Sequence, residues 1–321
     1  MHHIHIKPLA NGPYLHALGW TGGPPYAAMA RNSAQFSELL PRLSFADNRA
    51  ALLVRDDADT LKAKLAELPL PFLRSSGVAR ARNAARSTVF GAMLAKELRA
   101  TFADNTAIVG DRVGIAMVSS SAIVPIFWRF ESVGLADSWQ RTDTMLLPAS
   151  IPSSVVTAAS TVTGSHAAAL TLTDGAFGML AGIEHAFLSF FHDRSDAFMV
   201  IGGDEAFQPM VDAAASINAR IEVLDGAAGM VLTREAVSPG GWQVCFAQTI
   251  SDKQAPLFDD AWSHADVLRV DCGDRLTAYT AALVPHAIHH ALDTDADSVV
   301  IDFIVKDRAR GLLGLRRNKA A

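Results

Sequence analysis

The stretch TLTDGAFGMLAGIEHAF (residues 171–187) decides the fold. A short apolar strand runs into an Asp-Gly turn, and the turn opens a long apolar helix. Many enzymes place a nucleophile at such a corner, because backbone N–H groups and the helix dipole stabilise negative charge there. This corner holds Asp174, Gly175 and Ala176, and none of them is a Cys or a Ser. The sequence therefore predicts an active-site corner without a nucleophile.

The composition argues against several classes of protein. The chain has 321 residues, of which half are hydrophobic, and a formal net charge of −5. The negative charge argues against a general nucleic-acid binder, and no apolar run reaches the roughly 18 residues that a membrane span needs. Cys245 and Cys272 are too few for a disulfide framework, so we expect a cytoplasmic protein. The apolar content indicates a large core, a large subunit interface, or both.

The first 110 residues are rich in Ala and Arg. The N-terminus, MHHIHIKPLANG, lacks the apolar core of a signal peptide, and we expect its three histidines on an ordinary exposed terminus rather than in a metal chelate. Apolar residues in 79–102 recur on one helical face. The arginines that precede them are interpreted as a solvated helix face, with a docking patch for an acidic partner as the alternative.

From residue 112 onward, strand and helix patterns alternate. Strands are predicted at 112–120, 167–173, 197–203 and 227–235, and helices at 122–135, 152–164, 175–191 and 207–217. Few polar positions interrupt the helix at 175–191, so we expect it to be buried nearly all round. The alternation predicts an α/β domain with layered sheets.

After Pro239 the pattern restarts in a shorter form. A strand is predicted at 242–250, a helix with a kink or break at Pro285 is predicted over 276–292, and closing strands are predicted at 298–305 and 311–317. The Ser-Pro-Gly-Gly turn at 238–241 is the candidate boundary. We therefore divide the chain into an N-terminal helical and strand region (1–110), a core (111–237) and a truncated C-terminal half (238–321).

Read in order, five segments resemble the thiolase-type β-ketoacyl synthases. They are RVGIAMVSSS, DTMLLPASIPSSVVTAASTVTG, ALTLTDGAFGMLAGIEHA, DAFMVIGGDEAF and LDGAAGMVLTRE, which together span residues 112–235. The C-terminal segments resemble the end of that family's second half more loosely. The resemblance implies a thiolase-like layered α-β-α-β-α fold whose second half is truncated.

The departures from the family concern its catalytic groups. In an active synthase a Cys at the helix tip takes the acyl group, and two histidines of the second half assist decarboxylation. Alignment by the helix places Ala176 at the nucleophile position, and alignment by the preceding strand places Asp174 there; neither forms a thioester. The family's Gly-His before the last helix reads Gly273-Asp274-Arg275 here.

The relatives with such losses are chain-length factors and short ketosynthase-like proteins. The resemblance therefore implies a non-catalytic subunit that forms a heterodimer with an active β-ketoacyl synthase and reaches an acyl carrier protein through that complex. Its pathway would be type II polyketide or fatty-acid-like biosynthesis, polyenes included. Phe177, Met179 and Leu180 are candidate tunnel or interface residues, with plain core as the equal alternative.

Asp174 has two interpretations. We expect its carboxylate to cap free N–H groups at the helix N-terminus. The alternative is a degenerate thiolase-fold enzyme in which Asp174 is the general base of a hydrolysis or a decarboxylation. A third interpretation is a structural or regulatory subunit that touches no substrate.

Two further patterns are weighed as sites and set aside. His286, His289 and His290 have the i, i+3, i+4 spacing of metal ligands, but only Asp293 or Asp295, beyond the helix end, could complete the coordination. Neither a metal nor a cofactor is therefore expected. Ser119 begins a run of three serines after a strand, without the Gly-x-Ser-x-Gly context of a serine nucleophile. A loop is the preferred interpretation of that run.

Overall fold

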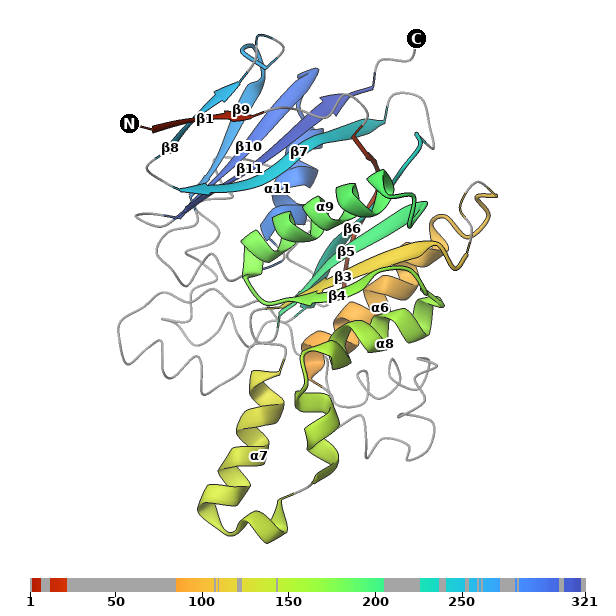
Figure 1. The fold of residues 1–321 in the computed structure, drawn as a ribbon, viewed down its shortest axis with the longest axis vertical. Helices are drawn as coiled ribbons and strands as arrows, with labels where there is room; N and C mark the ends of the chain where they lie inside the picture. Colours follow the sequence, from red (N-terminus) through yellow and green to blue (C-terminus); the bar gives the residue numbers. More distant parts are fainter. Residues whose placement is uncertain are drawn as a thin grey trace.

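The computed structural model describes residues 2–6, 12–21, 85–106, 108, 110–119, 123–142, 144–204, 226–236, 241–251, 254–258, 260, 262–271, 281, 283–305 and 309–318. Its largest unit is a nine-stranded sheet with the strand order β4-β3-β5-β6-β2-β7-β11-β10-β9 (Figure 1). A separate parallel pair consists of β1 (His2–Ile6) and β8 (Gln254–Phe258).

Five strands form the first half of the large sheet: β2 (Tyr14–Thr21), β3 (Val113–Val118), β4 (Ala169–Leu172), β5 (Ala197–Asp204) and β6 (Gly226–Thr233). β3 is parallel to both β4 and β5, whereas β6 is antiparallel to β5 and β2. Every residue of β3 is buried. Continuous apolar runs of this kind are typical of strands that are covered on both faces.

Four strands form the second half: β7 (Trp242–Ser251), β9 (Asp266–Asp271), β10 (Ser298–Val305) and β11 (Ala309–Arg317). β9 is parallel to β10, and β11 is antiparallel to β10 and β7. The order β9-β10-β11-β7 thus repeats β3-β5-β6-β2, without a counterpart of β4 among the described residues. The two halves join where Tyr14 and Leu15 of β2 pair with Gln243 and Trp242 of β7.

Two helices pack between the half-sheets, α9 (Gly175–Phe191) and α11 (Leu283–Leu292). α9 contacts β3, β4 and β5 of the first half and also β7 and β11 of the second. One apolar cluster therefore contains α9, α11 and the inward residues of both half-sheets. Figure 1 shows the two helices between the two parts of the sheet. The burial of α9 against both halves makes it the centre of the fold.

The other face of the first half-sheet is covered by α6 (Arg86–Ala100) and α8 (Ser153–Thr163). Val113, Ile115 and Met117 of β3 pack with these helices, whereas Ala116 and Val118 pack with α9. This alternation follows from the two-residue period of a strand. α8 ends at Gly164, which has a φ of 65°. Glycine adopts this left-handed conformation without steric cost.

A different layer covers the outer face of the second half-sheet. Phe246 of β7 contacts Phe258 of β8 and Trp262, with ring centroids 5.9 Å and 5.0 Å apart. Cys245, Ile250, Val300 and Leu312 complete this cluster. In the described part of the chain, Phe258 of β8 and the turn that contains Trp262 thus pack on the face that corresponds to the one covered by α6 and α8 in the first half.

The α7 arm, residues 124–151, projects from the body below α6 and α8 in the view of Figure 1. It consists of α7 (Val124–Ala136) and two 3-10 helices, η3 (Trp139–Arg141) and η4 (Thr144–Ser150). Its length comes entirely from the crossover between the parallel strands β3 and β4.

Most of the predicted elements are confirmed. The structure is α/β with layered sheets, and the helix predicted at 175–191 has these bounds. The predicted strands at 112–120, 167–173, 197–203, 227–235, 242–250, 298–305 and 311–317 and the helices at 122–135 and 152–164 all overlap observed elements. No described helix is long and apolar enough to cross a membrane. The division of the chain into three regions stays a prediction.

One prediction about the fold needs correction. α9 is not buried all round, because its second half exposes His185, Leu188 and Phe191. The kink or break expected at Pro285 stays a prediction, because the described helix α11 begins at Leu283 and most of the residues just before it lie outside the described set. The N-terminus forms a strand, β1, that was not predicted, and the exposure of its histidines stays a prediction.

Other predictions fall outside the described residues. They concern the helix at 207–217, the arginines at 80 and 82, and residues 276–280 of the C-terminal helix. β8 and β9 were not predicted from the sequence.

Candidate functional site

The strand-to-helix corner between β4 and α9 is the candidate site. β4 ends at Leu172, Asp174 occupies the N-cap position, and Gly175 begins α9 with a φ of 51°. This φ explains the glycine, because other residues are strained in the left-handed region. The Gly178 N–H donates to the Asp174 carbonyl over 3.0 Å and closes the first helical turn.

Asp174 does not cap the helix with its side chain. Its residue is exposed, and no side-chain capping hydrogen bond forms at this helix start. The prediction of a carboxylate cap is therefore wrong. The carboxylate is exposed to solvent just before α9, and no apolar side chains enclose it as they would enclose a buried general base.

Ala176, the other position aligned with a nucleophile, is fully buried. Its methyl group belongs to the cluster that joins the two half-sheets. An alanine offers no nucleophilic atom, no proton and no metal ligand. The corner thus has an exposed carboxylate before the helix and an inert, enclosed side chain inside its first turn.

Phe177, Met179 and Leu180 are also inside the chain's own core. Phe177 is 6% exposed, and Met179 and Leu180 are 0% exposed. A Cβ added at Gly311 of β11 would lie 2.3 Å from Leu180 Cδ1 and 3.0 Å from Phe177 Cε1. Both side chains therefore reach from the first half of the molecule to a strand of the second. Their burial agrees with the plain-core alternative, and a tunnel role stays a prediction.

Glycines let α9 approach the first half-sheet closely. A Cβ at Gly178 would lie 2.7 Å from Val118 Cγ1, and one at Gly182 would lie 2.8 Å from Val200 Cγ1. These contacts explain the glycines of this helix by packing rather than by chemistry. Further along the helix, burial raises the pKa of the half-buried Glu184.

Ser119 is a polar neighbour of the corner. It follows β3, and its N–H donates to the carbonyl of Leu172 at the end of β4 over 2.9 Å. The residue is 1% exposed, and its hydroxyl finds no hydrogen-bond partner in the part of the chain that the structure describes. Ser120 and Ser121 lie outside the described residues, so the loop interpretation of the serine run stays a prediction.

The second half supplies no sulfur to this corner from its described residues. Cys245 on β7 is buried in the outer cluster with Phe246 and Trp262, on the side of the sheet away from α9. Burial raises the pKa of this thiol to about 11, so it is protonated at neutral pH. Cys272 and the 273–275 segment lie outside the described residues.

The histidines of α11 gather at its C-terminal end. His289 and His290 occupy the last turn, where the helix dipole favours a positive charge. The side chain of His286 lies outside the described set. Across the described residues, no three His, Cys, Asp or Glu side chains are close enough together to hold a metal ion.

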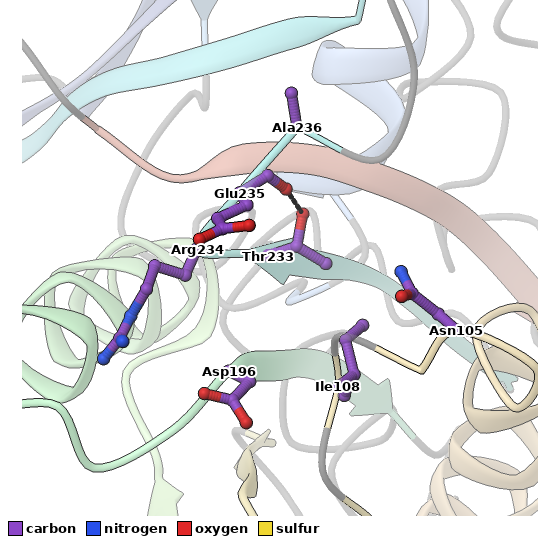
Figure 2. A pocket seen from close by; sticks show the side chains of 7 residues that line it. All are labelled: Asn105, Ile108, Asp196, Thr233, Arg234, Glu235 and Ala236. Atoms are coloured by element: carbon purple, nitrogen blue, oxygen red, sulfur yellow. Dashed lines mark hydrogen bonds between the residues drawn. The ribbon is translucent and has the colours of Figure 1, made fainter.

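A pocket of about 320 Å³ opens at the other end of the strands of the first half-sheet (Figure 2). It is lined by Asn105, Ile108, Asp196, Thr233, Arg234, Glu235 and Ala236. Asp196 immediately precedes β5, and Thr233 ends the antiparallel β6. The corner instead follows the end of β4, a strand parallel to β3. The pocket and the corner are therefore at opposite ends of the strands.

Ion pairs between arginines and aspartates lie beside this pocket. Arg112 donates from Nε to both carboxylate oxygens of Asp196, each over 3.1 Å, and from Nη2 to Asp193. Arg234, which extends away from Asn105 and Ile108 in Figure 2, donates to Asp193 and to the Phe190 carbonyl. These two guanidinium groups lower the pKa of Asp193, Arg234 more strongly. The network ties the end of α9 to the sheet. Glu235 also lines the pocket, and Nε of Arg234 is buried without a hydrogen-bond partner among the described residues.

Comparisons with known proteins identify the fold. No family model matches the sequence, and no curated protein matches it. Among solved structures, the ishigamide ketosynthase/chain length factor superposes with a TM-score of 0.59 at 15% identity, covering 95% of this chain and 99% of that one. A β-ketoacyl synthase from Burkholderia phymatum gives a TM-score of 0.58 at 12% identity, covering 96% and 99%.

A third neighbour comes from a type II polyketide synthase, a ketosynthase solved with its acyl-carrier protein and bound to the hexaketide. It superposes with a TM-score of 0.58 at 9% identity, covering 95% of this chain and 99% of that one. Identities this low establish the architecture alone. The protein therefore has the mixed α/β, thiolase-like fold of ketosynthases.

Proposed function

We propose that this chain is a non-catalytic ketosynthase-like subunit of the chain-length-factor type. It pairs with an active β-ketoacyl synthase and shapes the tunnel in which an acyl or polyketide chain grows. The observation that carries the proposal is the corner itself, where Asp174, Gly175 and Ala176 occupy the helix start that supports a nucleophile in this fold.

Condensation requires a group that holds the acyl chain as a thioester. Ala176 cannot form one, and the exposed carboxylate of Asp174 cannot replace a thiolate. The buried, protonated thiol of Cys245 is enclosed in the outer layer. A scaffold that keeps the corner and lacks the thiol is best explained by pairing, because the active partner then supplies the chemistry.

The kind of partner is supported by the neighbours. One of them is described as a ketosynthase/chain length factor, and another was solved with an acyl-carrier protein. β4, which ends the large sheet, has an unpaired side among the described strands, and such an edge is available for pairing with a second chain. The carrier protein would then meet this chain only within the complex.

Phe177, Met179 and Leu180 remain the candidates for shaping the tunnel. Since all three are buried in the single chain, a tunnel role requires that the partner's active site open toward the start of α9. Conservative changes such as Met179→Leu keep the core filled and suit a test of product length. A changed product spectrum at an unchanged yield of complex would support the tunnel role.

The alternative of an independent enzyme using Asp174 receives less support. Its carboxylate is exposed and has no described partner that would orient it as a base. Turnover of an acyl thioester by the purified chain alone would favour that alternative.

Co-expression tests the proposal. The chain is produced together with an active β-ketoacyl synthase from the same organism, and the complex is measured by size-exclusion chromatography with light scattering. We expect a stable 1:1 heterodimer and poor solubility of the chain alone. A soluble monomer that ignores the ketosynthase would contradict the proposal.

A further inference from the structure

The pocket of about 320 Å³ in the first half of the molecule has no part in the proposed function. It opens at the end of the strands that is remote from the corner before α9. Its volume equals that of roughly ten water molecules, which is near the lower limit for a small-molecule site. A ligand that fits this pocket is therefore small, and its chemistry must suit the polar groups of the wall.

The charged side chains at the pocket do not balance. Arg112 pairs with Asp193 over 2.8 Å and with Asp196 over 3.1 Å, and Arg234 pairs with Asp193. Two arginines thus share two aspartates. Glu235 lines the same pocket, but its bond within the described part of the chain is made by its backbone carbonyl and not by its carboxylate. Among the described residues, one negative charge is therefore left uncompensated at the pocket.

The polar groups of the pocket wall are mainly hydrogen-bond acceptors. Thr233 is 2% exposed, and its hydroxyl donates to the Glu235 carbonyl over 2.8 Å, so toward the pocket its oxygen can only accept. The Asp196 carboxylate accepts from Arg112 and, as a carboxylate, has further lone pairs. Nε of Arg234 is fully buried, so this donor does not face the open space. The wall therefore favours a ligand that donates hydrogen bonds and carries a positive charge.

Backbone hydrogen bonds hold this wall in place. The Arg234 N–H donates to the Asp196 carbonyl over 3.0 Å, and the Asp196 N–H donates to the Arg112 carbonyl over 2.8 Å. Asp193 has a φ of 54°, a left-handed conformation that Asp adopts more readily than most residues, and its carboxylate binds both arginines. A wall that is already ordered loses little conformational freedom when a ligand binds, and this favours affinity.

The pocket also has an apolar part. Ile108 lines it next to the side chain of Asn105. Figure 2 shows the carboxylates of Glu235 and Asp196 on one side of Thr233 and the Asn105 side chain on the other. A ligand with a charged head and a short hydrocarbon tail matches this division, because the head meets the carboxylates and the tail meets Ile108.

We infer that this pocket binds a small primary alkylammonium ion. Its ammonium group has three N–H donors and one positive charge, which match the acceptors of the wall and the uncompensated carboxylate of Glu235. An organic cation suits the pocket better than a metal ion, because the described residues include no group of three metal-ligating side chains. The inference is independent of the proposed function, since the pocket lies away from the corner before α9.

Saturation-transfer NMR with butylammonium chloride tests the inference. The probe is titrated against the full chain, alone or in its complex with a ketosynthase, and butan-1-ol and butanoate are the neutral and anionic probes of equal length. We expect a millimolar dissociation constant for butylammonium and binding of the other two that is at least about tenfold weaker, because only the ammonium group compensates the carboxylate. No binding of butylammonium, or equal binding of butan-1-ol, would overturn the inference.

Two matched variants locate the binding. Glu235→Gln removes the uncompensated charge, and Asp104→Asn removes a carboxylate next to Asn105 that does not line the pocket. Both residues are exposed, so both variants should fold, and each changes the net charge by the same amount. We expect Glu235→Gln to weaken butylammonium binding about tenfold and Asp104→Asn to change it less than about twofold. Equal effects of the two variants, or unchanged binding by Glu235→Gln, would rule out the pocket as the site.

Discussion

The two halves of the sheet share one strand order and differ in what lies between their strands. In the first half, β3 ends at Val118 and α9 begins at Gly175, so residues 119–174 hold α7, η3, η4, α8 and β4. In the second half, β9 ends at Asp271 and α11 begins at Leu283, which leaves only residues 272–282. A crossover between parallel strands needs about a dozen residues or more, so eleven cannot hold a counterpart of that excursion and a further strand.

The comparison shows which parts of each half are required for a packed fold and which parts are not. The four strands and one central helix of the second half pack well without an excursion, because the inward faces of β7, β10 and β11 are buried against α9 and α11. The excursion of the first half supplies the β4 edge, which lacks a second neighbour among the described strands, and the exposed apolar side chains of the α7 arm. Under the proposed function, we therefore expect the first half to provide most of the contact with the partner.

The largest expected effect concerns the ion pairs of the two halves. On β10 the carboxylate of Asp302, 3% exposed, accepts hydrogen bonds from Nε of Arg310 over 3.1 Å and from its Nη2 over 2.5 Å. Arg310→Met would leave this carboxylate buried and unpaired, and we expect a loss of about 3–5 kcal/mol in the free energy of unfolding. Urea denaturation measures it.

Two controls sharpen this comparison. Arg112→Met in the first half removes a pair that water reaches, so its loss should be much smaller. Asp302→Leu combined with Arg310→Met should recover much of the stability, because no buried charge remains. An equal loss in the free energy of unfolding for Arg310→Met and Arg112→Met would contradict the claim that only the ion pair of the second half is buried.

The junction of the halves is the next test. A Cβ at Gly12, just before β2, would lie 2.1 Å from the Val244 carbonyl oxygen of β7. Gly12→Ala must therefore displace backbone where β2 joins β7, and we expect it to cost about 1–3 kcal/mol. Gly110→Ala is the control, because its Cβ would approach nothing closer than 3.5 Å. Thermal unfolding of both variants checks the prediction, and equal midpoints would contradict it.

Cys245, the described cysteine of the second half, should be protonated at neutral pH and inaccessible to reagents in solution. Burial raises the pKa of Cys245 from 9.0 to about 11, and the nearby Arg316 opposes this slightly. Because the folded state holds this proton more tightly, the contribution to stability is present below about pH 9 and is lost as the pH rises toward 11. We expect Cys245→Ala to flatten this part of the stability profile by up to about 2 kcal/mol.

Alkylation provides a second measurement of how accessible the Cys245 thiol is. Iodoacetamide at neutral pH should modify Cys245 in the urea-unfolded protein and leave it unmodified in the folded protein. Rapid modification of the folded protein at Cys245, located by peptide mapping, would show that the outer cluster is open.

The smallest effect is expected at Asp174. Its exposed carboxylate makes no capping bond, so Asp174→Asn should change the free energy of unfolding by no more than about 0.5 kcal/mol. We also expect partner binding and the activity of the complex to be retained. A loss of turnover greater than about a hundredfold with an intact complex would support acid–base catalysis by Asp174 instead.

Sequence reasoning found the elements whose pattern is strong. The strand at β3 was predicted because it is a continuous apolar run, and the helix at α9 was predicted because its apolar residues recur at helical spacing. β9 was missed because it is a short edge strand with charged residues such as Asp266 and Arg269, which interrupt the alternation.

The position of the candidate site was predicted from the sequence, but the side-chain interactions within it were predicted only in part. The absence of a thiol between Asp174 and Ala176 is visible in the sequence, but whether an N-cap carboxylate bonds to the helix depends on its rotamer and backbone angles. The exposure of large apolar side chains on α7 escaped prediction for another reason. A helix that is apolar on two faces gives no indication of which face the core will cover, and only the packing of Ile126 and Gly134 shows that Phe127 and Trp128 remain outside.

The central claim is that this chain accompanies condensation without carrying the acyl group. Intact-protein mass spectrometry of the co-purified complex, incubated with an acyl thioester donor, tests it most directly. We expect one acyl adduct on the ketosynthase subunit and an unchanged mass for this chain. A stoichiometric acyl adduct on this chain, in the complex or alone, would contradict the account.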